Sequence, residues 1–274
     1  MSATRWSESF GAAAQSSMHV YEEVMVPRMF TPWAQLLLDE LALSAGERVL
    51  DVACGPGSVA RLAAARVGVS GRVVGCDLSS AMLAIAAAKP PVGGGGRIDY
   101  HEASAERLPV DDDAFDVVTC QQGLQFMPDR PAALSEMRRA LRPGGRIGIA
   151  VWSEIDRSPA LLALADALEE VAGAELAERY STGPWGFPDG GLLAQLIEQG
   201  GFDDVSVSTR TLPVTFEGGA AQLVSTLAAT PLADEIDRLS PERRRRLLEL
   251  VADATGGGPI SSQLESNVAL AHTT

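Results

Sequence analysis

Short apolar runs alternate with helical patterns through the first half of the chain. Each run is nearly all apolar, which is typical of parallel strands buried on both faces. Strands are predicted to begin at Val49 and to lie over Gly71–Leu78, Ile98–Ala103, Ala114–Cys120 and Arg146–Trp152, with helices after Gly57 and over Ser79–Ala88 and Pro131–Leu141. This alternation predicts an α/β fold, a doubly wound sheet with helices on both faces.

The pattern changes after Trp152. Amphipathic helices are predicted over Ser158–Ala172 and Gly191–Gly200, an antiparallel strand over Asp204–Phe216, a helical stretch over Gly219–Ala254 and a last strand over Ser266–His272. The stretch after Gly218 is therefore a helical insert before the last strand. Residues 1–44 are predicted to be helical in pieces, with breaks at Pro27 and Pro32. Their many large apolar side chains either pack on the core or form a lid over a pocket.

Composition narrows the classes of function. The net charge of −14 argues against a nucleic-acid partner, because phosphate backbones reward clustered Lys and Arg. No apolar run reaches the roughly 20 residues that span a bilayer, and the polar start is unlike a signal peptide, so we expect a cytoplasmic protein with no membrane span. Three scattered cysteines fit neither a disulfide framework nor a zinc site, and we expect no metal.

The clearest chemical signal is the turn Gly55-Pro56-Gly57 between the first strand and its helix. Glycines let a backbone approach a ligand closely, and the amides of the following helix offer donors. Asp77 ends the second strand, where a carboxylate can accept both hydroxyl hydrogens of an adenosine ribose or can merely cap the next helix. Asp51 would repel a pyrophosphate but attract the cationic groups of S-adenosylmethionine, which favours that cofactor over NAD.

Five ordered motifs carry a family resemblance. They are VLDVACGPG at 49–57, GCDLSSAML at 75–83, ASAERLPV at 103–110, FDVVTCQQGLQF at 115–126 and LRPGGR at 141–146. Together they resemble the class I S-adenosylmethionine-dependent methyltransferases, and within these the branch of the ubiquinone/menaquinone-biosynthesis C-methyltransferases. The resemblance covers about residues 45 to 152. It implies a Rossmann-like methyltransferase fold with a seven-stranded, mostly parallel sheet.

The resemblance also implies S-adenosylmethionine as cofactor, S-adenosylhomocysteine as product, and a set of binding residues. Asp51 and the glycine turn would face the methionine portion, Asp77 the ribose, and Leu78 the adenine. The implied cofactor-binding residues are Asp51, Ala53, Gly55, Gly57, Asp77, Leu78, Met82, Ser104, Ala105, Glu106, Gln121, Gln122 and Leu124. Ser104 stands where this branch often has an acid, so its bond to the adenine would be neutral and weaker.

We expect a single methyltransferase domain over 1–274, with an N-terminal helical lid (1–44), a cofactor-binding core (45–152) and an acceptor-side part (153–274). The acceptor pocket is expected from Met18–Trp33, the Gly183–Pro188 loop and the helical insert. Its apolar and aromatic content favours a small hydrophobic or aromatic acceptor. Candidates for a general base are His19 and Tyr21, and a mechanism without a base stays open.

Two other functions fit parts of the pattern. One is a protein that binds S-adenosylmethionine without transferring its methyl group, as a pericyclase, a lyase-type catalyst or a regulatory module. The other is an NAD-type oxidoreductase, which the charge of Asp51 disfavours. Whether the chain forms a homodimer stays open.

Overall fold

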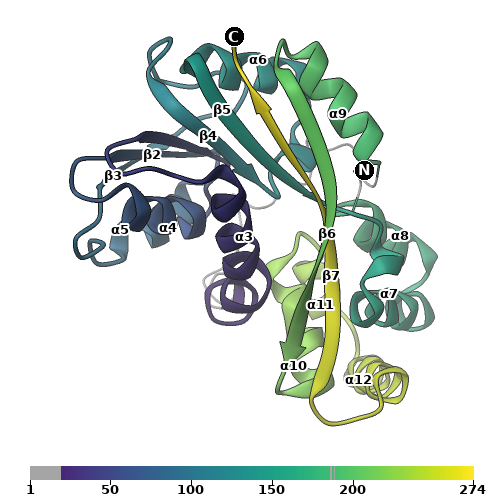
Figure 1. Ribbon diagram of the computed structural model, residues 1–274. Helices are drawn as coiled ribbons and strands as arrows, with labels where there is room; N and C mark the ends of the chain where they lie inside the picture. Colours follow the sequence, from purple (N-terminus) through teal and green to yellow (C-terminus); the bar gives the residue numbers. More distant parts are fainter. Residues whose placement is uncertain (1–19, 186, 188) are drawn as a thin grey trace.

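The computed structural model describes residues 20–185, 187 and 189–274. Its centre is one seven-stranded sheet in the order β3-β2-β1-β4-β5-β7-β6, in which β7 runs antiparallel to both of its neighbours (Figure 1). The strands are β1 (Arg48–Val52), β2 (Arg72–Asp77), β3 (Arg97–Glu102), β4 (Phe115–Gln121), β5 (Leu141–Trp152), β6 (Asp203–Phe216) and β7 (Ile260–His272). The predicted doubly wound, mostly parallel sheet is confirmed.

Helices cover both faces of this sheet (Figure 1). On one face α3 (Thr31–Leu41) packs against α4 (Ser58–Val67), and on the other α6 (Arg130–Ala140) packs against α9 (Gly190–Gln199). Each face carries its own layer of buried apolar side chains. The remaining elements before β6 are α5 (Ser80–Ala88), η2 (Leu124–Phe126), η3 (Ile155–Arg157), α7 (Pro159–Ala172) and α8 (Ala174–Thr182). Ser79 caps α5 as predicted, since its side chain accepts from the Met82 amide.

The N-terminal segment is partly core, which corrects the expectation that all of it forms a lid. Trp33 and Leu37 of α3 are almost completely buried against the sheet. The preceding η1 (Tyr21–Phe30) is a π-helix with Pro27 inside it, so the predicted break at Pro27 is wrong. Arg28 Nη1 donates to the carbonyl oxygens of Glu23 and Val24, and this satisfies backbone acceptors beside the proline.

Strands β6 and β7 continue beyond the sheet as a two-stranded ribbon. Strand β5 pairs with β7 only over Ser266–His272, whereas β6 stays paired to β7 as far as Phe216↔Ile260. Strand β7 therefore begins earlier than predicted. The ribbon leaves the sheet at the carboxyl ends of the parallel strands and carries the helical insert (Figure 1).

The insert consists of three short helices and the longer α12 rather than the one helical stretch predicted after Gly218. These are α10 (Gly219–Ser225), η4 (Thr226–Ala229), α11 (Ala233–Asp237) and α12 (Pro241–Thr255). Pro231 follows η4 and Pro241 begins α12, because proline interrupts a helix in its interior but is accepted at the first turn. Leu223 and Leu227 are fully buried and attach the insert to the core layer of α3 and α7.

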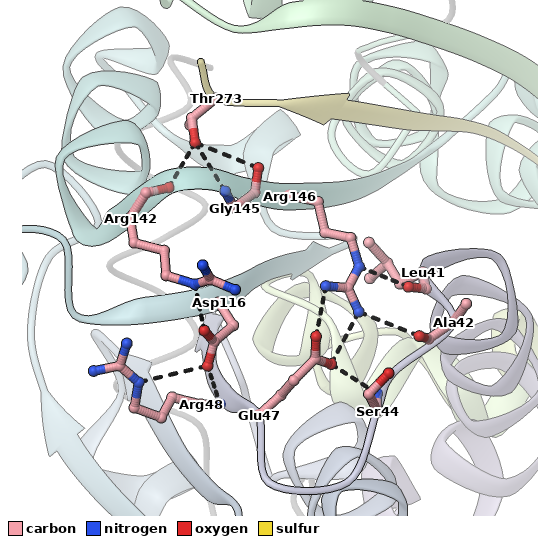
Figure 2. Close-up of polar contacts among 10 residues, drawn as sticks. All are labelled: Leu41, Ala42, Ser44, Glu47, Arg48, Asp116, Arg142, Gly145, Arg146 and Thr273. Atoms are coloured by element: carbon pink, nitrogen blue, oxygen red, sulfur yellow. Dashed lines mark hydrogen bonds and ion pairs between the residues drawn. The ribbon is translucent and has the colours of Figure 1, made fainter.

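An ion-pair network joins the amino ends of the strands, away from the glycine turn (Figure 2). Arg146 of β5 donates to both carboxylate oxygens of Glu47, at 2.8 and 2.9 Å. The same guanidinium donates to the carbonyl oxygens of Leu41 and Ala42 at the end of α3. Arg146 therefore fixes α3 to the sheet and satisfies carbonyls that the helix leaves unpaired.

Candidate functional site

The glycine turn has a backbone that needs its glycines. Gly55 has φ +52° and Gly57 has φ +84°, the left-handed region that glycine enters without steric cost. A Cβ on Gly57 would also collide with the Tyr100 hydroxyl beneath it. Ala53, just before the turn, has φ +57° although it is not a glycine. Strained backbone of this kind is held in place by its surroundings and gathers at ligand sites.

Asp77 links the glycine turn to the end of β2. Its Oδ2 accepts from the Gly55 amide at 2.7 Å, and its Oδ1 accepts from the Ser79 amide at 2.8 Å. Burial raises the pKa of Asp77 above its usual range, while these backbone donors oppose the shift. The alternative that Asp77 merely caps the next helix is partly realised, because the carboxylate supports the start of α5 while Ser79 itself is the cap. The same carboxylate lines the cavity described below.

Asp51 is buried under the turn. Its Oδ1 accepts from the Thr119 hydroxyl at 2.8 Å, and its Oδ2 accepts from the Ala60 amide of α4 at 3.0 Å. Burial raises the pKa of Asp51 to about 7, against the effect of these two donors. The nearby charge of Asp77 adds to the rise. Because Asp51 and Asp77 lie close together, their negative charge favours the binding of a cationic group beside them.

One cavity of about 410 Å³ lies at the carboxyl ends of the parallel strands, a size typical of small-molecule sites. Most of the predicted cofactor-binding residues line it: Asp51, Ala53, Gly55, Asp77, Leu78, Met82, Ser104, Ala105, Glu106, Gln121 and Gln122. Gly57 and Leu124 are not among its lining residues. Gly57 is the N-cap of α4, and the Leu124 side chain is fully buried in the core layer beneath α6. Their predicted contacts with a cofactor stay predictions.

One edge of the cavity is formed by the apolar side chain of Leu78 and by the polar loop after β3, which contains Ser104 and Glu106. Leu78 is 51% exposed and follows directly after Asp77. The Ser104 hydroxyl accepts from the Glu106 amide at 3.2 Å, so the turn itself uses this oxygen. Glu106 Oε1 in turn accepts from the Asp129 amide. This edge offers a flat apolar contact next to hydrogen-bonding groups, which suits a nucleobase.

The end of β4 ties the cavity to neighbouring segments. Gln121 Nε2 donates to the Phe30 carbonyl of η1 at 3.0 Å. Gln122 has φ +55°, and its Nε2 donates to the Ser266 hydroxyl of β7 at 2.7 Å. These bonds hold the β4 end, the N-terminal helix and the last strand in one arrangement around the cavity.

Helix η1 covers the cavity and is fastened to the glycine turn by Lys89. The Lys89 ammonium donates to Glu22 of η1 and to the Pro56 carbonyl, both at 2.9 Å. Tyr21, a predicted base candidate, lines the cavity and stacks on Phe30 at 5.0 Å between ring centroids. Burial and the charges of Asp77 and Glu22 raise the pKa of Tyr21 above its usual value, and its role as a base stays a prediction. The other candidate, His19, lies outside the described residues.

A cluster of aromatic side chains also lines the cavity. Trp152 at the end of β5 lies 5.4 Å from Trp185 and 6.3 Å from Phe30, measured between ring centroids. Tyr180 of α8 and Leu161 of α7 line it as well. Sequence reasoning anticipated the contributions of η1, of the 183–188 loop and of the insert, whose Thr226, Ala229 and Thr230 line the cavity. It missed Trp152, Leu161 and Tyr180, although a tryptophan ending a parallel strand was a usable signal.

In the described part of the chain, no group of three or more His, Cys, Asp or Glu side chains is arranged to hold a metal ion. None of the described helices is both long and apolar enough to cross a membrane.

Comparison with known proteins identifies a family. Residues 8–217 match the model of the ubiE/COQ5 methyltransferase family. The ubiquinone/menaquinone biosynthesis C-methyltransferase UbiE of Hahella chejuensis is 37% identical over 123 residues, which are 44% of this chain and 49% of that protein. The 2-phytyl-1,4-naphtoquinone methyltransferase of Synechococcus elongatus is 38% identical over 118 residues, 43% of this chain and 51% of that protein. The chain thus spans about half the length of these curated relatives.

Solved structures agree on the fold. The phosphoethanolamine N-methyltransferase 2 of Haemonchus contortus, solved with phosphomonomethylethanolamine and S-adenosylhomocysteine, superposes with a TM-score of 0.58 at 19% identity. The similarity covers 93% of this chain and 56% of that chain. At this level of identity the comparison concerns architecture, and the acceptor has to be argued from the site.

Proposed function

Because the chain belongs to the ubiE/COQ5 methyltransferase family, we propose that it transfers a methyl group from S-adenosylmethionine to a small, hydrophobic, quinone-type acceptor. The observation that carries the proposal is one cavity lined by the buried Asp51, the partly buried Asp77 and several aromatic side chains. The aspartates suit a cationic cofactor, and the aromatic side chains suit a flat apolar acceptor. The names of the quinone-methylating relatives support the acceptor class.

The residues of the cofactor side fit S-adenosylmethionine. Asp51 and Asp77 provide negative charge where burial already makes an uncompensated carboxylate costly, so a cationic ligand relieves that cost. The left-handed glycine turn leaves room for close approach, and exposed Leu78 offers an apolar face to an adenine. We assign the cofactor to this side, with Asp77 toward the ribose and Asp51 toward the methionine portion.

When bound, S-adenosylmethionine supplies a methyl group on a positively charged sulfur, which is already activated for transfer. The chain's own contribution is then to align the acceptor and exclude water, so proximity provides much of the acceleration. Helix η1 and the adjoining Trp152 and Trp185 line the cavity and help to exclude water from it. We propose no resident metal ion for this reaction.

Calorimetric titration with S-adenosylmethionine and, separately, NAD tests the cofactor assignment. We expect S-adenosylmethionine to bind and NAD not to bind. Asp77→Asn keeps the shape of the side chain but removes its charge, and should weaken binding about tenfold or more. Asp253→Asn removes an exposed carboxylate from α12 and should leave binding unchanged. Binding of NAD instead, or an Asp77→Asn variant that binds normally, would overturn the assignment.

Formation of S-adenosylhomocysteine tests the reaction itself. The purified protein is incubated with S-adenosylmethionine and a panel of reduced quinones under anaerobic conditions, and the product is measured by mass spectrometry. We expect acceptor-dependent S-adenosylhomocysteine together with a methylated quinol. Tight cofactor binding without that product across the panel would favour a protein that binds the cofactor without transferring methyl groups.

We also propose a cytoplasmic location. It is supported by the three cysteines, Cys54, Cys76 and Cys120, which are all buried and unpaired, as in a reducing compartment. Fractionation of the native host, with detection by antibody, tests this location, and recovery of the protein in a membrane or secreted fraction would contradict it.

A further inference from the structure

Three side chains that line the cavity carry a buried polar atom with no hydrogen-bonding partner among the described residues. These atoms are Ser58 Oγ, Gln121 Oε1 and Trp185 Nε1. Buried polar atoms are nearly always paired, because leaving one unpaired costs free energy. Of the three side chains, only Gln121 has a second polar atom, and that atom is bonded to another element. Gln121 therefore links the cavity to a neighbouring part of the fold.

The second polar atom of Gln121 holds helix η1 at its carboxyl end. Gln121 Nε2 donates to the carbonyl oxygen of Phe30, the last residue of η1, at 3.0 Å. Phe30 is also the N-cap of α3, whose Trp33 is almost completely buried in the core. The bond therefore lies at the joint between a fixed helix and the helix that covers the cavity.

The unpaired oxygen of Gln121 belongs to the cofactor side of the cavity. Thr119 and Gln121 are two residues apart on β4, so their side chains lie on the same face of the sheet. Thr119 donates to Asp51 at 2.8 Å, so Gln121 lies one step nearer the carboxyl edge on the face that carries Asp51. Under the proposed function, the methionine portion of the cofactor lies toward Asp51. Its ammonium group supplies donors that an amide oxygen accepts.

The two ends of the Gln121 amide act together. With Oε1 unpaired, rotation of the amide costs the side chain only its bond to Phe30. A donor in the cavity is paired only when Oε1 points toward it, and in that orientation Nε2 points toward the Phe30 carbonyl. Occupancy of the cofactor side therefore favours the arrangement in which η1 is held.

The held arrangement of η1 also fixes part of the aromatic cluster formed by Phe30, Trp152 and Trp185. The Phe30 ring lies 6.3 Å from Trp152, and Trp152 lies 5.4 Å from Trp185, measured between ring centroids. Holding the Phe30 backbone therefore fixes one member of the cluster before an acceptor binds. A site formed in advance loses less freedom on binding.

We propose that Gln121 is a positioning residue that couples the two ligands, so that cofactor bound at its oxygen strengthens acceptor binding through Phe30. The inference rests on the proposed function and adds an energetic link between its two ligands. Such coupling is reciprocal, so a bound acceptor strengthens cofactor binding by the same factor.

Titration with duroquinone measures this coupling without turnover. Duroquinone is a flat quinone with no unsubstituted ring carbon, and S-adenosylhomocysteine carries the ammonium group but no transferable methyl group. Quinones quench tryptophan fluorescence, and Trp152 and Trp185 both line the cavity. Saturating S-adenosylhomocysteine should tighten duroquinone binding about fivefold or more, and titration in the reverse order should give the same factor.

Gln121→Met keeps the length of the side chain and removes both polar atoms. The variant should bind duroquinone alone as tightly as wild type but lose the gain that S-adenosylhomocysteine gives. A merely structural role would weaken binding without this split. Gln195→Met makes the same change at an exposed position of α9 and should keep the full gain. A thermal melt of each variant checks the fold.

Hydrogen exchange followed by mass spectrometry gives a second readout that needs no acceptor. S-adenosylhomocysteine should slow amide exchange in peptides that cover η1 in wild type, because the helix is held more of the time. The same ligand should slow this exchange much less in Gln121→Met, although the variant is saturated with it.

The outcomes separate the two proposals. Wild-type protein that does not bind S-adenosylhomocysteine in calorimetry contradicts the proposed function itself. Bound S-adenosylhomocysteine that changes neither duroquinone affinity nor exchange in η1 overturns the coupling alone, and needs no variant. A Gln121→Met variant with the full wild-type response also overturns it. Duroquinone that does not bind at all contradicts a quinone-type acceptor, and exchange in η1 then decides the coupling.

Discussion

Asp51 should make the ligand-free protein less stable as the pH rises from 4 to 7. Burial raises its pKa to about 7 in the folded state, whereas an aspartate in an unfolded chain titrates near 3.9. The folded state therefore holds this proton more tightly. Its contribution to stability is complete below about pH 4 and is lost as the pH rises through 7.

The magnitude follows from the two pKa values. One unit of difference corresponds to about 1.4 kcal/mol, so titration of Asp51 lowers the free energy of unfolding by about 2 to 3 kcal/mol between pH 5 and pH 8. Asp51→Asn removes the titration while keeping one oxygen that can accept from Thr119. The variant should therefore gain about 2 to 3 kcal/mol relative to wild type over the same interval.

Urea unfolding of wild type and Asp51→Asn at pH 5 and pH 8, without cofactor, measures this change. Asp253→Asn serves as the control, because its carboxylate is exposed on α12. A stability difference between wild type and Asp51→Asn that is the same at both pH values would refute a raised pKa at Asp51.

The same carboxyl couples cofactor binding to pH. A cationic ligand favours the ionised form, whose population rises about tenfold between pH 6 and pH 8 for a pKa near 7. The affinity for S-adenosylmethionine should rise by a similar factor in wild type and stay flat in Asp51→Asn. Calorimetry in buffers of different ionisation enthalpy should also detect proton release, and a pH-independent wild-type affinity would contradict the coupling.

Three other contacts lead to expected outcomes. Lys89→Met removes the hydrogen bonds that join η1 to the glycine turn and should raise the rate of S-adenosylmethionine release several-fold, measured by stopped-flow fluorescence. An unchanged release rate would show that these bonds do not retain the ligand. Gly75→Ala places a Cβ 2.8 Å from the Tyr100 ring and should lower the free energy of unfolding by about 1 to 3 kcal/mol. The Tyr100→Leu background should restore the lost stability. A Gly75→Ala single variant with wild-type stability would contradict the predicted steric clash. Arg146→Met removes the ion-pair partner of Glu47 and should lower the free energy of unfolding, measured in urea, by about 2 kcal/mol, a value between those of exposed and buried ion pairs. Cofactor affinity should stay unchanged, and an altered affinity at unchanged stability would argue against a purely structural network.

The ligand-binding edge was predictable because its signals are local. An apolar run followed by glycines, and a second run that ends in Asp77, place both features at the same end of a parallel sheet. Eleven of the thirteen predicted cofactor-binding residues line the cavity for this reason. Leu124 shows the limit, since the sequence places it beside Gln121 and Gln122 but only the short η2 helix turns its side chain into the core.

The acceptor side was less predictable because packing decides it. Helix α8, which carries Tyr180, was not predicted, although it is amphipathic and buries Leu176, Ala177 and Tyr180. The π-helical η1 continues through Pro27 because its surroundings satisfy the carbonyls, and Arg28 does so from within the same helix. Strand β5 begins at Leu141 although Pro143-Gly144-Gly145 follows, since a register shift against β4 absorbs these residues.

The ribbon of β6 and β7 makes the helical insert a separable segment of the chain. Phe216 and Ile260 are register partners, so the polypeptide between them leaves and re-enters the protein at one point. A replacement segment has only to close a gap of about 5 Å between paired strands. Asp51 and Asp77 lie on other strands, so exchanging residues 217–259 as a cassette leaves the cofactor side intact. Under the proposed function, a new insert would change only the part of the acceptor pocket formed by Thr226, Ala229 and Thr230.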